Sequence, residues 1–480
     1  MRSGMKVFCI SITVSQILSL FICLETQARC RLVKDIRAGA FSSGITFLTN
    51  FKGTLYFSAI DGVHGRELWK SNGTAASTLM VKDIWPGGDE SYPAYLTVFN
   101  GALYFSANDG VNGKELWKSD GTAAGTFMFK NIWPGAAGSS PKYLTNLGGT
   151  LFFQAIDSVD NGAELWKSNG TAAGTVMVKN INEFGSSLPS HFTNVNGTLY
   201  FQARDCGETG IELWKSDGTK AGTDIVKNIN EHYCGDSDPE QLTEWLRVKE
   251  DHLLLFTADD GVHGRELWRS DGNGSFTFMV GDIFDNGTES SDPLWLTQLG
   301  SSIVFSAYEN DHGRELWGYS TGSDPYLIKD IYDNPGFPEA GSDPEFLTVM
   351  ADTLYFAATA FDGTGRELWK SDGTEAGTVM VKDIRPGASS SPSYITNVNG
   401  ILYFAADDGE HGAELWRSDG TAAGTVMVQD INPSGGSDPK DLYNVNGALY
   451  FTADDGEHGP ELWLCNTHNS LPFLPLLLLE

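Results

Sequence analysis

The sequence predicts an all-β protein: a β-propeller of four-stranded antiparallel blades, nine blades in one ring closed by the N-terminal strand. Two observations support this prediction. The tripeptide Glu-Leu-Trp occurs nine times between Glu67 and Glu461, at intervals of 47 to 54 residues. Each interval holds four short runs rich in Val, Ile, Tyr, Phe and Thr, divided by turn residues, which is typical of β-strands. Four strands in a repeat of this length are typical of a propeller blade.

The elements follow the same order in each repeat, and we call the strands a to d. Strand a is an LTNV-type run, and it ends in a turn such as Asn100-Gly101, which favours a type I′ hairpin. Strand b is a TLYFSA-type run, strand c is RELWKS and strand d is TVMVKDI. A DDGVHG-type loop joins b to c, a DGTAAG-type loop joins c to d, and a variable Pro/Gly/Ser-rich connection leads to the next repeat.

The two ends of the repeat array show how the ring closes. The first recognisable strand, 33–36, is of type d with no c before it, and the last, 461–463, is of type c with no d after it. The N-terminal strand can therefore complete the final blade, which leaves no open sheet edge. Two smaller propellers would need a linker and two closures, neither of which the sequence offers.

The repeated tripeptide itself has a structural interpretation. Nine of the 13 tryptophans lie in it, so we expect them to pack between blades. In five repeats a Lys follows the Glu by 15 residues, as in Glu67 and Lys82. In a regular c–d hairpin these side chains would face each other as an opposite-charge pair. This favours a structural role for the Glu over a catalytic one.

The same register predicts a disulfide at the closure. If Glu461 faces Lys34, then Cys465 faces Cys30. A second disulfide is predicted between Cys206, in a b–c loop, and Cys234, in the following d–a loop. Four cysteines beyond the N-terminal segment, an even number, suit a protein of an oxidising compartment.

The chain divides into three predicted parts: a signal peptide at 1–28, the propeller at 29–465 and a tail at 466–480. Arg2 and Lys6 precede an apolar run, and Thr26 and Ala28 are the small residues expected before a cleavage site. An uncleaved anchor is the alternative. The apolar tail is too short to span a membrane, and a lipid-anchor signal is its less favoured interpretation. We expect a secreted, extracellular protein with no membrane span in the mature chain.

Charge limits the partners. The chain has 62 Asp and Glu against 32 Lys and Arg, a net charge of −30, which argues against nucleic acid as a partner. The b–c and d–a loops carry much of this acidity and emerge on one face, where the d–a connections vary most; variable loops on a rigid scaffold favour binding there. Four glycosylation sequons lie on the opposite face and the fifth on the variable face: Asn72, Asn169, Asn196 and Asn273, and then Asn286.

Candidate binding residues come from the same loops. Histidines recur at one position three residues before the Glu, at 64, 263, 312, 411 and 458. The candidate ligand-binding residues are Asp89, Glu90, His263, His411, His458, Asp408 and Asp455. Calcium is the one candidate cofactor, at Asp407, Asp408, Asp454 and Asp455, because it prefers oxygen ligands. No regular D-x-D-x-D-G ladder is present, so acidic turn residues are the alternative interpretation.

The run Glu-Leu-Trp-Lys-Ser-Asp-Gly-Thr, at 115–122, 212–219 and 367–374, resembles the ELWxxDGT-repeat proteins, and the segment 104–121 is similar to the blade repeat of TolB-type propellers. The resemblance covers about residues 31 to 465. It implies a secreted or surface-exposed propeller and transfers no catalytic residues.

The sequence favours a secreted binding or adhesion module that presents an acidic loop face to glycan, matrix or protein ligands. One alternative is a carbohydrate-active lyase or hydrolase with carboxylates at the propeller channel. The other is an acidic matrix protein that binds calcium or mineral. An enzyme is the less favoured class because the chain contains no His-Glu-x-x-His, Gly-x-Ser-x-Gly or P-loop motif.

Overall fold

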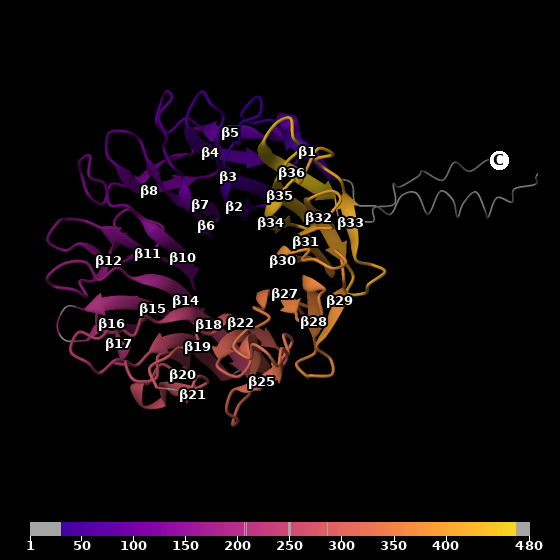
Figure 1. The fold of residues 1–480 in the computed structure, drawn as a ribbon. Coiled ribbons are helices and arrows are strands. Elements are labelled where there is room, and N and C mark those ends of the chain that lie inside the picture. The colour runs from indigo at the N-terminus through magenta and orange to yellow at the C-terminus, as the bar shows by residue number, and fades with distance from the viewer. Residues whose placement is uncertain (1–29, 206, 208, 248–250, 286, 467–480) are drawn as a thin grey trace, which may run out of the picture.

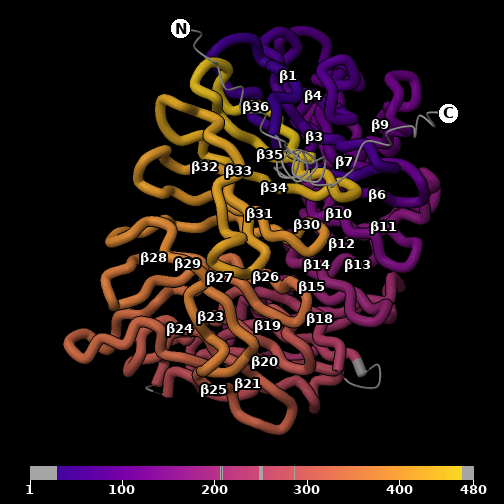
Figure 2. Tube along the Cα trace, turned by 90° about the vertical axis from the view of Figure 1, so that its right-hand side faces the viewer, coloured from indigo at the N-terminus to yellow at the C-terminus, as the bar shows by residue number. Residues whose placement is uncertain are grey.

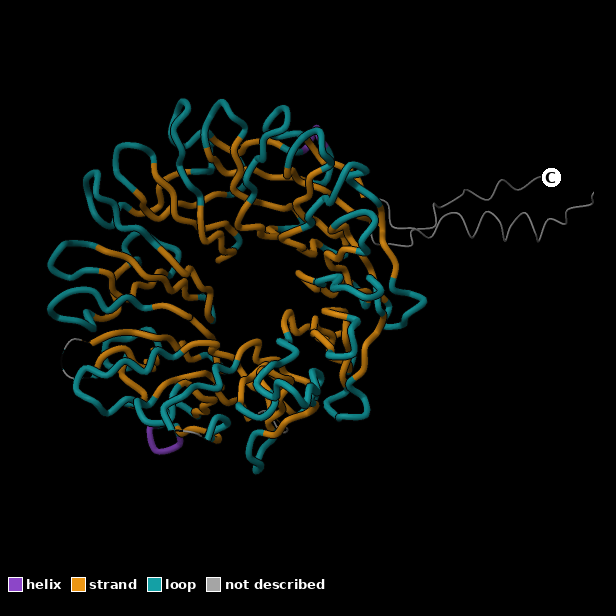
Figure 3. Tube along the Cα trace, viewed as in Figure 1, coloured by secondary structure: helices purple, strands orange, loops and turns teal. Residues whose placement is uncertain are grey.

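The computed structural model describes residues 30–466 except 206, 208, 248–250 and 286. In that part of the chain nine four-stranded antiparallel sheets form one ring, which confirms the predicted nine-bladed propeller (Figure 1). The blades follow one another around the ring in chain order, and β1 and β36 lie side by side where the ring closes (Figure 2). Strands make up the body of each blade, and loops cap their ends (Figure 3). Within the described residues, no helix has the length and apolar character to cross a membrane.

The strands occupy four concentric positions, a to d from the channel outward. Position a holds β2 (Thr46–Phe51), β6 (Ala94–Phe99), β10 (Lys142–Leu147), β14 (Ser190–Val195), β18 (Glu240–Arg247), β22 (Leu294–Leu299), β26 (Glu345–Met350), β30 (Ser393–Val398) and β34 (Lys440–Val445). Position b holds β3 (Thr54–Ile60), β7 (Ala102–Asn108), β11 (Thr150–Ile156), β15 (Thr198–Asp205), β19 (Asp251–Asp259), β23 (Ser302–Glu309), β27 (Thr353–Ala360), β31 (Ile401–Asp407) and β35 (Ala448–Asp454).

Position c holds β4 (Arg66–Ser71), β8 (Lys114–Ser119), β12 (Ala163–Ser168), β16 (Gly210–Ser216), β20 (Arg265–Ser270), β24 (Gly313–Tyr319), β28 (Gly365–Ser371), β32 (Ala413–Ser418) and β36 (Pro460–Asn466). Position d holds β5 (Leu79–Lys82), β9 (Phe127–Lys130), β13 (Val176–Lys179), β17 (Asp224–Lys227), β21 (Phe278–Gly281), β25 (Tyr326–Lys329), β29 (Val379–Lys382), β33 (Val426–Gln429) and β1 (Cys30–Lys34). Two short 3-10 turns, η1 (Ala75–Ser77) and η2 (Gly274–Phe276), lie in c–d loops.

The core lies between neighbouring blades. Trp69 of blade one packs with Leu55 and Phe57 of its own blade and with Leu462 and Leu464 of blade nine. Eight of the nine repeated tryptophans are buried, which confirms their predicted packing role; Trp317 is partly buried. Because each sheet covers its apolar face with the next sheet, the blades stabilise one another around the ring.

The closure is formed by β1 and β36, and it contains the predicted disulfide. Cys30 pairs with Cys465 in the antiparallel register and is bonded to it, with Cα atoms 4.1 Å apart. The second predicted bridge is not formed among the described residues: Cys234 is exposed with a free thiol, and Cys206 lies outside the described residues. The Cys206–Cys234 pairing therefore stays a prediction.

The predicted Glu–Lys pairing in the c–d hairpin is wrong. A bulge between Leu68 and Trp69 places Lys82 opposite Leu68. A shift of one residue reverses the face on which a side chain lies, so Glu67 and Lys82 are separated by the sheet. Lys82 instead donates to the carbonyl oxygen of Thr126 in the next blade at 2.7 Å. In the closing blade the bulge falls after Leu32, so the cysteines keep their predicted register while Lys34 faces Leu462.

Candidate functional site

The central channel is lined by strand a of each blade. Beside blades one to five it contains a cavity of about 780 Å³, whose walls include Phe47, Tyr95, Tyr143 and His191. All four are the second residue of their strand a. Strand a follows directly from the d–a loop, so these residues stand at the channel mouth on the face of the variable loops.

The second residue of strand a has an unusual backbone in all nine blades. It adopts a positive φ of 53° to 62°, next to a bulge in the a–b pairing. The nine residues are Phe47, Tyr95, Tyr143, His191, Gln241, Trp295, Phe346, Tyr394 and Asp441. Six of them are aromatic, although this conformation costs a residue with a Cβ about 1–3 kcal/mol. Bulges re-aim side chains and such strain clusters at functional sites, so the repeated geometry marks this mouth as a candidate site.

The six aromatic residues form two arcs at the channel mouth. We define the first arc as Phe47, Tyr95 and Tyr143 and the second arc as Trp295, Phe346 and Tyr394. In the first arc the neighbouring ring centroids are 5.5 Å apart at both steps. In the second arc they are 5.3 Å and 5.8 Å apart. Four of these rings are exposed by 37–43%, which leaves aromatic surface open to a ligand.

A threonine two residues further along strand a fixes the arc positions. The Thr97 hydroxyl lies 3.1 Å from the Tyr95 carbonyl oxygen and 2.8 Å from that of Leu144 in the next blade. Thr348 makes the same pair of contacts in the second arc, with Phe346 and Ile395. Each of these threonines therefore links the carbonyl group of an arc residue to the backbone of the next blade. The aromatic side chains are thus held in place by contacts between neighbouring blades.

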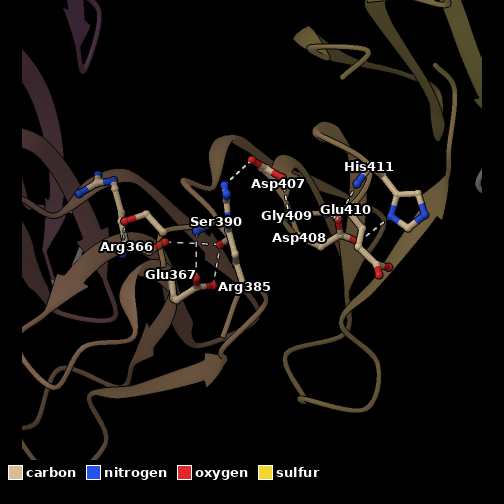
Figure 4. Close-up of polar contacts among 10 residues, drawn as sticks. Arg366, Glu367, Arg385, Ser390, Asp407, Asp408, Gly409, Glu410 and His411 are labelled. Atoms are coloured by element: carbon tan, nitrogen blue, oxygen red, sulfur yellow. Dashed lines mark hydrogen bonds and ion pairs between the residues drawn. The ribbon is translucent and has the colours of Figure 1, made fainter. Parts of the chain in front are cut away.

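The glutamate of the repeated tripeptide is fully buried and does not line the 780 Å³ cavity. Figure 4 shows the glutamate of blade seven, Glu367, beside Ser390. Glu367 accepts from the backbone N–H groups of Ile384 and Ser390, both at 2.9 Å, and from the Ser390 hydroxyl at 2.5 Å. It thus anchors the d–a loop to strand c, and equivalent bonds recur in the other blades. In blade one, burial raises the pKa of the equivalent Glu67 to about 7, although its hydrogen bonds to Ile84, Ser91 and Trp85 act in the opposite direction. The contacts explain the recurrent Glu as a structural residue.

The b–c loops hold the histidines against aspartates. His411 Nδ1 lies 2.8 Å from the Asp408 carboxylate, which also accepts from the backbone N–H groups of Glu410 and His411 (Figure 4). The hydrogen bond that the His411 ring donates to Asp408 raises the pKa of His411. Asp407 accepts from Gly409 and pairs with Arg385 of the preceding d–a loop at 2.5 Å. These carboxylates therefore hold the loop in shape.

Blades without this histidine use a neutral substitute. In blade two, Asn112 replaces the histidine and Asn131 replaces the aspartate at the end of strand d, and the two amides bond at 3.0 Å. Asn161 and Asn180 do the same in blade three at 3.2 Å. Asn112 also donates to the loop aspartate Asp109 at 2.8 Å, so an amide at the histidine position keeps the bond to this aspartate. This favours a role of the position in loop structure.

The candidate calcium ligands have the same turn role. Asp455 binds the backbone of Glu457 and His458 and the His458 ring, and Asp454 accepts from Gly456. Among the described residues, no cluster of three or more His, Cys, Asp or Glu side chains could hold a metal ion. Calcium binding at Asp407, Asp408, Asp454 and Asp455 stays a prediction, and the observed bonds are those of the alternative interpretation, acidic turns.

The predicted ligand-binding residues do not line the 780 Å³ cavity. His263 pairs with Asp260 in its own loop at 2.8 Å, and Glu90 lies 4.0 Å from the Arg66 guanidinium. Four of the predicted sequon asparagines are exposed, namely Asn72, Asn169, Asn196 and Asn273, whereas Asn286 lies outside the described residues. Glycosylation stays a prediction.

The arcs were missed in the sequence, although a signal was present. In blades two to nine the d–a loop ends in Ser-x-Pro, and the second residue after this proline is the second residue of strand a, as in Ser139-Ser-Pro-Lys-Tyr143. The strand prediction began one residue later, at the LTNV-type run. Aromatic residues are common in strands, so the pattern alone does not reveal the bulge or the positive φ that turns them to the channel.

The fold and this mouth together define a nine-bladed propeller with an aromatic-lined channel. No protein-family model matches the chain, and no curated protein is significantly similar to it in sequence. Among solved structures, a puromycin-hydrolysing peptidase of Mycobacterium tuberculosis is similar at 11% identity and a TM-score of 0.38, over 75% of this chain and 58% of that one. Prolyl oligopeptidase B from Galerina marginata is similar at 12% identity and a TM-score of 0.39, over 76% and 55%. This chain thus spans less than two thirds of each.

Proposed function

We propose that this protein is an extracellular binding module whose channel mouth takes a glycan, with the two aromatic arcs as the contact surface. The observation that carries the proposal is the two arcs of aromatic residues, four of them exposed, which are held in strained backbone at the same position of successive blades. Membership of the ELWxxDGT-repeat family and secretion belong to the same proposal.

The chemistry of the mouth suits a saccharide. The C–H faces of a sugar ring pack against aromatic rings, whose faces carry negative potential, while its hydroxyl groups need polar partners. The cavity wall supplies both, because Thr49, Glu240 and Gln241 line the same cavity as the rings of the first arc. A concave site that places polar groups beside aromatic side chains can fix the orientation of a small ligand. The neighbouring rings, 5.5 Å apart, would engage consecutive sugar units.

The lyase or hydrolase alternative and the mineral-binding alternative have weaker support. Nine of the twelve carboxylates with raised pKa are the buried glutamates of the tripeptide, which are committed to the d–a loops. The other three are Asp238, Asp282 and Asp330, and none of them lines the 780 Å³ cavity. The loop aspartates are committed to turns, as His411 and Asp408 illustrate.

A glycan array with the purified protein, followed by calorimetry on the best ligand, tests the proposal. The double variant Tyr95→Ala/Tyr143→Ala should lose at least tenfold in affinity, since each ring contributes about 0.5–1.5 kcal/mol beyond the area it buries. Phe184→Ala is the matched control, because Phe184 is 87% exposed on the same face, outside the cavity wall. Unchanged affinity in the double variant would refute the channel mouth as the site.

A further inference from the structure

A recess opens beside the first arc. Its volume is about 380 Å³, and Phe47 and Tyr95 form part of its wall as well as part of the channel wall. Three cationic side chains line it: Arg66, Lys114 and Lys142. A ligand stacked on the first arc would therefore reach a basic recess, although the protein as a whole has a net charge of −30.

Two of these cations have no carboxylate partner. Lys114 holds its ammonium 5.0 Å from the centre of the Tyr92 ring. Lys142 is exposed, and among the described residues neither lysine forms an ion pair. Arg66 lies 4.0 Å from Glu90 and donates to the Gly44 carbonyl oxygen. The recess thus carries an uncompensated positive charge from its lysines.

In two other blades the equivalent cationic positions are paired with carboxylates. In blade seven the first residue of strand a is Glu345, where blade three has Lys142, and it pairs with Arg366 at 2.8 Å. In blade five Arg265 lies 3.9 Å from Asp292. In blades five and seven the arginine near the start of strand c is therefore paired with a carboxylate. Lys114 of blade two and Lys142 of blade three differ from this arrangement.

A second recess continues the basic surface. It has a volume of about 270 Å³ and shares Lys142 with the first recess and Tyr143 with the channel. Arg204 lines it and pairs with Asp236 at 2.8 Å. Lys142 thus stands between two recesses that both open beside the aromatic rings of the first arc.

We propose that the recesses at Lys114 and Lys142 take the anionic group of an acidic saccharide, a carboxylate or a sulfate, while the first arc holds its sugar rings. The inference rests on the proposed glycan-binding function and narrows its ligand class. The acidic surface does not prevent this binding: charges beyond about 8 Å are largely screened at physiological salt, so the nearby lysines dominate. The anion would gain charge-assisted hydrogen bonds from both ammonium groups.

The test compares matched acidic and neutral oligosaccharides by calorimetry at about 0.15 M salt. One arm uses oligogalacturonate and its methyl ester, and the other uses a sulfated oligosaccharide and its desulfated form. We expect one acidic form to bind at least tenfold more tightly than its neutral counterpart, and the arm in which this occurs identifies carboxylate or sulfate.

The variants Lys142→Gln and Lys114→Gln should each reduce the affinity for the acidic form about fivefold and leave the neutral form unchanged, since a partly exposed charge contact contributes about 1 kcal/mol. Lys142→Arg should restore the preference. Lys440→Gln is the matched control, because Lys440 begins strand a of blade nine and is also exposed. Thermal melting confirms that each variant is folded.

The outcomes separate the two proposals. Equal binding of acidic and neutral forms, or an equal loss of both in Lys142→Gln, overturns the acidic-ligand inference and leaves the glycan-binding function standing. Binding of none of the saccharides by the folded protein, here and on the array, overturns both.

Discussion

The disulfide at the ring closure gives the most direct test of the fold. The replacement of Cys30 and Cys465 by serine removes the covalent link between β1 and β36. Without it, β1 keeps its short antiparallel pairing, the burial of Val33 and the side-chain bonds from Arg31 and Lys34 to blade one. The backbone N–H groups of Ile36 and Arg37, just after β1, also still donate to the Glu461 carboxylate. The variant should therefore open first at this blade.

The expected size follows from loop entropy. The bridge closes a separation of 435 residues, for which the chain-entropy relation gives about 6 kcal/mol. This value is an upper limit, because it assumes that the whole propeller unfolds in one step, whereas single repeats can unfold locally. Most native disulfides contribute about 2–4 kcal/mol, and we expect that range for the opening of β1 and β36.

Hydrogen exchange followed by mass spectrometry measures this opening. A loss of about 2–4 kcal/mol corresponds to exchange about 30-fold to about 700-fold faster in the two strands. Blade five, on the other side of the ring, is the internal control and should exchange as before. Identical exchange rates in β1 and β36 with and without the disulfide would show that non-covalent contacts alone close the ring. This result would refute the predicted stabilisation by the disulfide.

Three further predictions concern stability. Burial raises the pKa of Glu67 from 4.5 to about 7, and the bond to Asp408 raises that of His411. Around neutral pH the folded state therefore binds more protons than the unfolded state. The stabilisation from groups with a raised pKa, such as Glu67, is complete below about pH 4.5 and is lost as the pH rises through about 7. The melting temperature should fall between about pH 5.5 and about pH 8, and a rise would contradict this. Phe404→Ala should cost about 3–5 kcal/mol in urea unfolding, since Phe404 is fully buried between blades seven and eight; a cost below about 1 kcal/mol would argue against this packing. Tyr143→Gly should be about 1 kcal/mol more stable than Tyr143→Ala, because only glycine adopts a φ of 56° without strain, yet both should bind glycan weakly; equal stability would show that the position is unstrained.

The repeated sequence by itself predicts most of the architecture. Four strands per unit, nine units and the incomplete first and last units led to one closed ring, and the pairing of Cys30 with Cys465 followed from the register. These features depend on spacing and turn chemistry, which are local and recur nine times. The tryptophans were placed correctly for the same reason, because a residue repeated once per blade packs where blades meet.

The tertiary structure decided what lies at the site. A bulge in strand d separated Glu67 from Lys82, and a bulge in strand a turned Tyr143 and its equivalents to the channel. A bulge depends on how a strand bends within its blade, and the alternation of residue types does not record it. The basic recess likewise joins Arg66, Lys114 and Lys142 from three blades, so that no segment of the sequence contains it. Local patterns thus determined the scaffold, whereas the contacts between blades determined the site.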